Sequence, residues 1–283
     1  MDVDKKPPGQ AYAARLDFSD PRADIATDLL TESGYSGNED KSGPLHSFVE
    51  HTMTFLFPAF LAVNLYLAAR EFEWFTLIAV IIIAAPLAWV LADFGSGLVH
   101  WFADTYGTAR TPLFGPWLIK PFRHHHVYPR DICTHGVVLT IGNSCTAAVP
   151  FQAGLLYLMV SDEEISGAQA FLALVFNLFS AAIVATNLFH KWAHAEKNNR
   201  LVLVLQRTRL LLSTDHHNGH HSGVFDSNYC ITNGWLNGAL DKIQFFRRTE
   251  IMLARIGVRS DAASNEHALP ESFPANSPES EVG

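Results

Sequence analysis

Clustered histidines are the residues of this sequence best suited to chemistry. Eleven of the 14 histidines fall in two segments, 93–135 and 190–221. Most of them form four clusters: His100 with Asp104, His124 to His126, His190 with His194, and His216, His217, His220 and His221. Residues three or four positions apart share one face of a helix, so clusters with this spacing can direct several donor atoms towards one point.

Together the clusters indicate a metal centre. A single pair of this kind is a weak signal, because such pairs also occur on surfaces and at helix ends. Four clusters are informative, since packed imidazoles repel one another when protonated and lose hydrogen bonds when neutral, and a bound cation removes both penalties. Up to about ten donors exceed what one tetrahedral zinc ion needs, so the sequence predicts two ions. Donor type alone leaves iron, zinc, copper and nickel open.

Four long uncharged stretches must position these clusters. A hydrocarbon core about 30 Å thick requires about 20 mostly apolar helical residues, and each stretch is close to that length or longer. The predicted spans are 52–69, 75–92, 136–160 and 168–189. Buried helices of a large soluble core are the alternative, but such helices seldom run uncharged this far four times in one chain. The sequence thus predicts an all-α, multi-pass integral membrane protein.

The spans place the histidine clusters on one face of the membrane. Four spans put both termini and the segment 93–135 on one side, and the links 70–74 and 161–166 on the other. The first side carries the excess of lysine and arginine, which makes it cytoplasmic by the positive-inside rule. We therefore expect a cytoplasmic, histidine-rich helical cap that holds the active site. The apolar segment 201–212 is too short to span and contains two arginines, which predicts a helix lying at the membrane interface.

The two ends of the chain differ from the predicted membrane domain, 51–248. Residues 1–50 are polar, acidic and rich in Gly, Pro and Ser, which predicts a disordered arm without a cleavable signal peptide. Residues 249–283 predict a polar tail, in which His267 is merely solvated. The three cysteines form no CxxC pair, so neither a disulfide framework nor a structural zinc site is indicated. The formal charge of −8 arises largely in these ends, and we expect no nucleic-acid partner.

Other metal-dependent classes fit the pattern less well. A zinc protease needs glutamate next to the first histidine of H-E-x-x-H as its general base, and Lys191 occupies that position. A histidine-rich transporter would place ligands near the bilayer midplane, whereas the predicted spans contain none. A membrane protein that only binds or senses a metal remains an alternative, although sensing requires a single site.

At these clusters the sequence resembles the membrane fatty-acid desaturase and hydroxylase superfamily, with its H-x3-H and H-x2-H-H boxes. Within it, the sequence is most similar to lipid desaturases of the Kua and CarF type, which include plasmanylethanolamine desaturases and relatives that act on plant phosphatidylglycerol. The resemblance covers about 100–246. It rests on the strings His100-Trp-Phe-Ala-Asp-Thr-Tyr-Gly107, Pro121-Phe-Arg-x-His-His126, Asn187-x-x-His-Lys-Trp-x-His194 and His216-His-x-x-His-His221, and on Tyr229 to Asn237.

The resemblance implies an O2-dependent enzyme with two non-haem iron ions. Its reaction would introduce the 1′,2′ double bond into the alkyl chain of a membrane ether phospholipid, plasmanylethanolamine, with two electrons from a donor of the cytochrome b5 or ferredoxin type. An acyl-lipid desaturase or a hydroxylase of the same superfamily is the alternative. In the fourth span, Phe171, Phe176 and Phe179 could line a pocket for the chain or simply pack between helices.

The resemblance also implies the metal ligands, and no catalytic residue beyond them is expected. They are His100, Asp104, His125, His126, His190, His194, His217, His220 and His221. Five more residues are expected to be either further ligands or hydrogen-bond partners of the ligand rings: His124, His135, His216, Asn187 and Arg123. The sequence departs from the family at His124, where glutamate is common, and at Asp215, where a basic residue is common.

Overall fold

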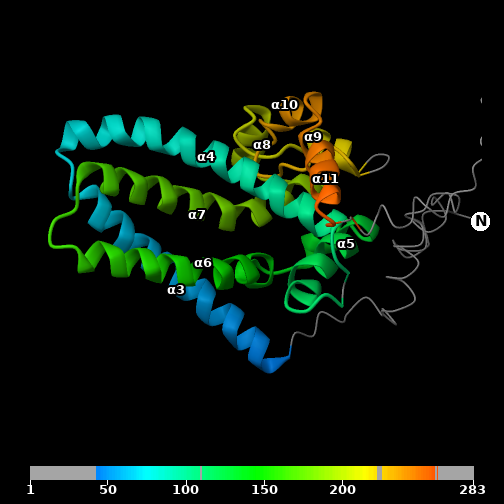
Figure 1. Cartoon of the computed structure of the whole chain (residues 1–283), viewed down its shortest axis with the longest axis horizontal. Coiled ribbons are helices and arrows are strands. Elements are labelled where there is room, and N and C mark those ends of the chain that lie inside the picture. The colour runs from blue at the N-terminus through cyan, green and yellow to red at the C-terminus, as the bar shows by residue number, and fades with distance from the viewer. Residues whose placement is uncertain (1–42, 109, 222–224, 259, 261–283) are drawn as a thin grey trace, which may run out of the picture.

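Four long helices dominate the fold. The computed structural model describes residues 43–108, 110–221, 225–258 and 260, and all regular elements among them are helices. Those long and apolar enough to cross a membrane are α3 (Pro44–Ala69), α4 (Trp74–Thr105), α6 (Val137–Ser161) and α7 (Gly167–His194). They run beside one another, and α7 packs against the other three (Figure 1). The four predicted spans are therefore confirmed as helices of membrane-spanning length.

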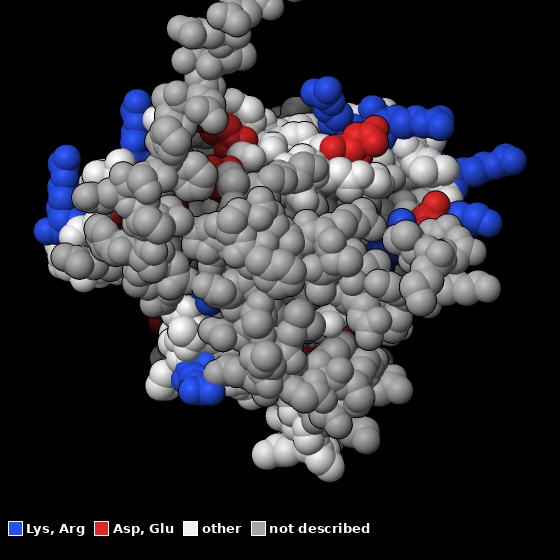
Figure 2. Space-filling model, turned by 90° about the vertical axis from the view of Figure 1, so that its right-hand side faces the viewer, with Lys and Arg blue, Asp and Glu red and all other residues white. Residues whose placement is uncertain are grey.

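Short helices form a cap at one end of the long ones (Figure 1). They are α5 (Lys120–Val127), α8 (Arg200–Arg207), α9 (Thr214–His220), α10 (Asn237–Lys242) and α11 (Phe245–Arg255). The links at 70–73 and 162–166 lie at the opposite end. Figure 2 views the cap from its outer side and shows both basic and acidic side chains on it, as expected of a surface outside the hydrocarbon. Which side of the membrane the cap faces stays a prediction.

Small and amide side chains determine how the long helices pack. Ala84 and Ala88 of α4 are buried against Val175 of α7, and small residues in such contacts let two helices approach closely. Between α3 and α6, the amide of Asn64 donates to the side chain of Gln152 over 2.7 Å, and both residues are buried. This bond pairs the side-chain N–H of Asn64 with the side-chain oxygen of Gln152, two groups that would find no hydrogen-bond partner in hydrocarbon. The packing holds α4 next to α7, and these two helices enter the cap together.

Helix α4 extends beyond the predicted second span, 75–92, and includes the His100 cluster, whose spacing indicated one helical face. The α4 helix continues to Thr105. Its polar residues Asp93, Ser96 and His100 are buried, because the later segment 229–236 covers them and provides hydrogen-bond partners. A charged residue therefore does not end the helix at this point.

The predicted interfacial helix at 201–212 is shorter than expected. The α8 helix ends at Arg207, and Arg209 adopts a left-handed backbone conformation with a φ of 57°. Leu212 then leaves the helical path, is fully buried, and donates its N–H to the Thr232 carbonyl. Burial of this leucine in the cap replaces the further helical turn that the apolar pattern indicated.

The predicted arm and tail contribute short stretches of helix. The α3 helix begins at Pro44 and α11 ends at Arg255, so the helical body extends beyond 51–248 in both directions. Residues 1–42 and 261–283, including His267, lie outside the described residues. Disorder of these ends stays a prediction.

Candidate metal centre

All nine predicted ligands meet where the long helices join the cap. Their donor atoms form two groups, and within each group these atoms lie within 4.8 Å of one another. The larger group comprises His125, His190, His194, His217 and His221. The smaller group comprises His100, Asp104, His126 and His220. No other described residue joins either group.

Helical geometry explains this convergence. Both α4 and α7 end with a pair of donors four residues apart, which extends one helical face beyond the apolar span. In and just after α9, offsets of three and four residues place His217, His220 and His221 on one side of the helix. Ser213 caps α9, because its hydroxyl oxygen accepts a hydrogen bond from the N–H of His216. The adjacent His125 and His126 of α5 diverge, one into each group. The α5 helix thereby connects the two groups.

In the larger group, ring nitrogens crowd around His217. Its Nε2 lies 2.8 Å from Nε2 of His190 and 3.0 Å from Nε2 of His221. The Nε2 atoms of His125 and His194 are 2.9 Å apart. Lone pairs directed at one another repel, whereas a cation among them is bound by all of them. The arrangement fits a metal ion better than it fits a network of hydrogen bonds.

In the smaller group, three imidazoles surround one carboxylate oxygen. Oδ2 of Asp104 lies 3.3, 3.6 and 3.7 Å from the Nε2 atoms of His100, His126 and His220. Neither carboxylate oxygen of Asp104 has a partner with hydrogen-bonding geometry in the described part of the chain, and the same holds for Nε2 of His100. A carboxylate buried in this way is costly, and a bound cation would relieve the cost.

Two backbone carbonyls determine the tautomers of ligand rings. Nδ1 of His100 lies 3.0 Å from the carbonyl oxygen of Tyr229, and Nδ1 of His220 lies 2.7 Å from that of Ser227. A carbonyl oxygen only accepts, so each Nδ1 carries the proton and donates it. The Nε2 lone pair of both rings is then directed into the smaller group, as outer hydrogen bonds commonly achieve for metal-binding histidines.

Burial keeps the metal-group histidines of the cap neutral. It lowers the pKa of His125, His126 and His217 well below the ordinary histidine value, and neighbouring histidines lower these pKa values further. Burial also lowers the pKa of His220 to about 4 and the pKa of His221 to about 2. At neutral pH these rings therefore carry no charge and have a lone pair available for a metal.

We expect acidification to destabilise the metal-free cap. In the unfolded chain a histidine gains a proton near its ordinary pKa of about 6.5, whereas folded His220 and His221 resist protonation. Between the unfolded and folded pKa values, the unfolded state binds more protons. The free energy of unfolding is therefore greatest above about pH 6.5 and falls as the pH decreases towards about 4. Thermal unfolding of chelator-treated protein measures this trend, and a Tm that rises on acidification would argue against neutral rings.

Three histidines expected as ligands or as their partners lie outside both groups. Ring nitrogens of His124 and His135 lie 4.0 and 3.5 Å from Oδ2 of Asp131. Nε2 of His216 instead accepts a hydrogen bond of 2.8 Å from the side-chain amide of Asn237. The structure thus offers no shared point at which these three rings could complete either group.

The remaining two predicted residues support the helices that carry ligands. Asn187 of α7 donates to the hydroxyl of Ser144 in α6 over 3.0 Å. Arg123 of α5 donates to the carbonyl of Ala103 over 3.2 Å and to that of Asp104 over 3.5 Å. Basic side chains satisfy the carbonyls at a helix end in this way. Arg123 therefore holds the end of α4, from which the Asp104 carboxylate projects.

Asp93 supports the centre in a way that the sequence pattern did not reveal. Its side chain is fully buried in α4. Its carboxylate accepts three backbone hydrogen bonds of 2.9 to 3.0 Å, from Asn233, Gly234 and Leu236. These residues belong to the segment 229–237, here called the clasp, whose Tyr229 carbonyl orients His100. Asp93 therefore fastens the clasp to the helix that carries two of the ligands.

Two glycines let the clasp pack this closely. A side chain at Gly97 of α4 would place its Cβ 2.6 Å from Sγ of Cys230 in the clasp. Within the clasp, Gly234 has a φ of 76°, and a Cβ there would lie 2.6 Å from the ring of His216. Any larger residue at either position would push the clasp away from α4 or from α9.

Replacing Asp93 with asparagine should weaken metal binding, although Asp93 lies outside both groups. An amide keeps one oxygen but turns an N–H group towards a backbone donor, so at least one of the three bonds is lost. Loss of such outer partners commonly costs about 10–100-fold in metal affinity. Competition with a chelator measures this loss. Gln152→Leu removes a buried hydrogen bond between α3 and α6 and should leave the affinity unchanged, so equal affinities in both variants would exclude a specific role for Asp93.

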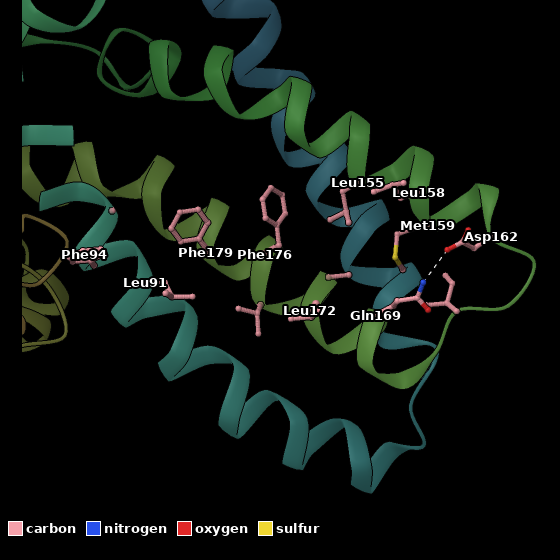
Figure 3. A pocket seen from close by; sticks show the side chains of 14 residues that line it. Leu91, Phe94, Leu155, Leu158, Met159, Asp162, Gln169, Leu172, Phe176 and Phe179 are labelled. Carbon is pink, nitrogen blue, oxygen red and sulfur yellow. Dashed lines mark hydrogen bonds between the residues drawn. The ribbon is translucent and has the colours of Figure 1, made fainter. Parts of the chain in front are cut away.

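An apolar cavity of about 730 Å³ lies between α4, α6 and α7 (Figure 3). Phe176 and Phe179 line it, whereas Phe171 packs against the buried alanines of α4. Phe179 and His190 are 11 residues apart in α7, which is about 16 Å along the helix axis. On α4 the lining includes Phe94, whose ring centroid lies 5.6 Å from that of Phe245 in α11, so the apolar cavity extends along the helices as far as the cap.

Comparisons with known proteins identify relatives of this chain. The lipid desaturase domain family matches residues 89–263. A Myxococcus xanthus protein named plasmanylethanolamine desaturase is 40% identical over 171 residues, which cover 60% of this chain and 59% of that protein. Plasmanylethanolamine desaturase 1 of Mus musculus is 36% identical over 194 residues, or 68% and 70% of the two chains. The chloroplastic fatty acid desaturase 4-like 1 of Arabidopsis thaliana is 35% identical over 185 residues, or 64% and 59%.

The matched region contains both metal groups, Asp93 and the clasp. The chain spans less than two thirds of the length of the bacterial relative. No solved structure matches the chain. The resemblance inferred from the histidine clusters is confirmed, and it begins earlier in α4 than the strings alone indicated.

Proposed function

Because the chain belongs to the lipid desaturase domain family, we propose that it is an O2-dependent desaturase whose metal groups bind two non-haem iron ions. The proposed substrate is a plasmanyl phospholipid, whose alkyl chain gains a 1′,2′ double bond and becomes a vinyl ether. Two relatives bear the name plasmanylethanolamine desaturase, which supports ethanolamine as the headgroup.

The observation that carries this proposal is the division of nine donors into two adjacent groups. Ring centroids of His126 and His221, which belong to different groups, are 5.4 Å apart, and those of His217 and His220 are 5.9 Å apart. Two ions bound at these groups would be neighbours. The larger group offers five imidazoles, and the smaller offers three imidazoles and one carboxylate. Iron accepts both kinds of donor, and none of the three cysteines belongs to either group.

The reaction explains why a metal is needed. Saturated C–H bonds react with no acid or base among the amino acids, so a redox cofactor must supply the oxidising power, and reduced iron with O2 supplies it when bound. Two hydrogen atoms leave the lipid chain. Together with two electrons and two protons from outside, they reduce O2 to two molecules of water.

The side chains around the centre exclude water and maintain geometry. His100, His217 and His220 are at most 1% exposed, so bulk water has little access to the donor atoms. Exclusion of water suppresses side reactions of a reactive centre. The carbonyls of Tyr229 and Ser227 keep two rings in one orientation. These features favour removal of hydrogen from a bound chain in a fixed position.

We further propose that the cap and both termini face the cytoplasm. The excess of lysine and arginine in the cap segments supports this orientation. An electron donor of the cytochrome b5 or ferredoxin type would then reach the cap from the cytoplasm.

The lipids of cells that make saturated ether phospholipids test the proposed function. Expression of the chain should produce vinyl-ether lipids, detected as aldehydes after mild acid treatment and by mass spectrometry. Hydroxylated alkyl chains would instead favour a hydroxylase, and new double bonds in acyl chains would favour an acyl-lipid desaturase. Unchanged lipids together with bound metal would favour a protein that only binds or senses the metal.

A further inference from the structure

A polar cavity of about 370 Å³ lies beside the larger metal group. Its wall includes residues that follow α5, the end of α7, and parts of α8 and α9. His194 and His221, which both belong to the larger group, form part of the wall. A molecule in this cavity would therefore contact side chains of the metal centre directly.

The wall of this cavity offers hydrogen-bonding groups and one charge of each sign. Its amide and hydroxyl side chains are Asn198, Gln206, Thr214 and Asn218. Its charged side chains are Arg130 and Glu196, whose nitrogen and oxygen atoms are 2.6 Å apart and which are 70% and 71% exposed. Such an exposed pair contributes little to stability, so each member can exchange its partner for a ligand at low cost.

The α8 helix places the cavity at the depth of lipid headgroups. Leu203 and Gln206 face the cavity from α8, whereas Leu201 and Val204 of the same helix are exposed. A helix with an exposed apolar face and basic ends lies in the interface between hydrocarbon and water. His194 is the last residue of α7, where that candidate span enters the cap. The cavity thus opens at the level where a phospholipid carries its charges.

We propose that this cavity binds the zwitterionic headgroup of the lipid substrate, with the phosphate at Arg130 and the ammonium at Glu196. The inference rests on the proposed function and gives its substrate a position. Only the glycerol unit separates the phosphate from the ether oxygen, so a headgroup held here brings the first carbons of the alkyl chain towards His194 and His221. A primary ammonium donates hydrogen bonds to a carboxylate, whereas a quaternary choline cannot. The cavity would therefore also favour ethanolamine over choline.

The variants Glu196→Gln and Arg130→Gln test this assignment. Purified iron-loaded protein is assayed with a saturated ether lipid that carries phosphoethanolamine and with its phosphocholine counterpart. Loss of a hydrogen bond between charged groups should raise KM for the ethanolamine lipid about tenfold in either variant, with little change in kcat or bound iron. Glu196→Gln should leave KM for the choline lipid unchanged, whereas Arg130→Gln should raise it as well.

Arg70 and Glu71 provide the matched control. They form a comparable pair, 3.1 Å apart, in the link at the opposite end of the long helices. Arg70→Gln and Glu71→Gln should leave both KM values unchanged. Native mass spectrometry of metal-free protein with a dialkyl phosphoethanolamine adds a readout independent of turnover, and Glu196→Gln should retain less lipid than the wild type.

The outcomes separate the two proposals. If the wild type forms a vinyl ether but neither Glu196→Gln nor Arg130→Gln changes KM or lipid retention, the headgroup assignment is wrong and the proposed function stands. If the wild type forms no vinyl ether, the proposed function is wrong, and lipid retention alone decides whether the cavity binds the headgroup.

Discussion

Replacing His217 with alanine should abolish lipid desaturation and release most of the bound iron. His217 is 1% exposed, and its Nε2 lies within 3.0 Å of two other predicted ligand nitrogens. Its removal takes away the atom around which the larger group is arranged. Loss of a residue that only hydrogen-bonds to a ligand commonly lowers metal affinity about 10–100-fold, so loss of a ligand itself should lower the affinity further. Vinyl-ether lipid and iron per chain, expected at about two for the wild type, measure the effect.

His51→Ala is the control for this variant. His51 is exposed on α3, and its Nδ1 lies 2.7 Å from the carbonyl oxygen of Ser47. Both variants should reach the membrane at wild-type levels, because the apolar helices rather than the metal drive insertion. Full activity in His217→Ala, or loss of activity in His51→Ala, would remove the basis for the ligand assignment.

Replacing Asp104 with asparagine should cost nearly as much activity. Three imidazole nitrogens lie within 3.7 Å of its Oδ2, and an amide is a neutral and much weaker donor to iron. If Asp104 merely ended α4, the change would cost about 1 kcal/mol of stability and leave catalysis intact. Bound iron and vinyl-ether lipid, compared at matched protein levels, distinguish these two roles.

Asp104→His sharpens the comparison. The histidine would offer an imidazole nitrogen to the metal in place of the carboxylate oxygen. This variant should therefore bind more iron and form more product than Asp104→Asn. Wild-type product from Asp104→Asn would exclude Asp104 as a ligand and leave the smaller group with three imidazoles.

Local spacing made most of the centre predictable from sequence. His190 and His194 lie on one helical face wherever the helix is placed, and the same is true of His100 and Asp104. The order of the spans also predicted that all four histidine clusters lie on the same side of the membrane. The division of His125 and His126 between the two groups could not be predicted, because it depends on how α5 docks against α4 and α7.

Asp93 shows what sequence pattern could not supply. Its partners are backbone N–H groups about 140 positions further along the chain, and backbone groups leave no signature in side-chain identity. A lone aspartate after an apolar stretch indicated only the end of a span. The same long-range contacts cover the polar part of α4 beyond the predicted span, where the helix continues to Thr105.

The most direct test of the central claim follows the hydrogens of the alkyl chain. Iron-loaded protein is given O2, a reductant and a plasmanylethanolamine that carries deuterium at C1′ and C2′. We expect a vinyl-ether product that has lost one deuterium from each of the two carbons, formed only by protein with iron in both groups. A product that has gained oxygen at either carbon, or unchanged lipid in the presence of fully loaded protein, would contradict the account.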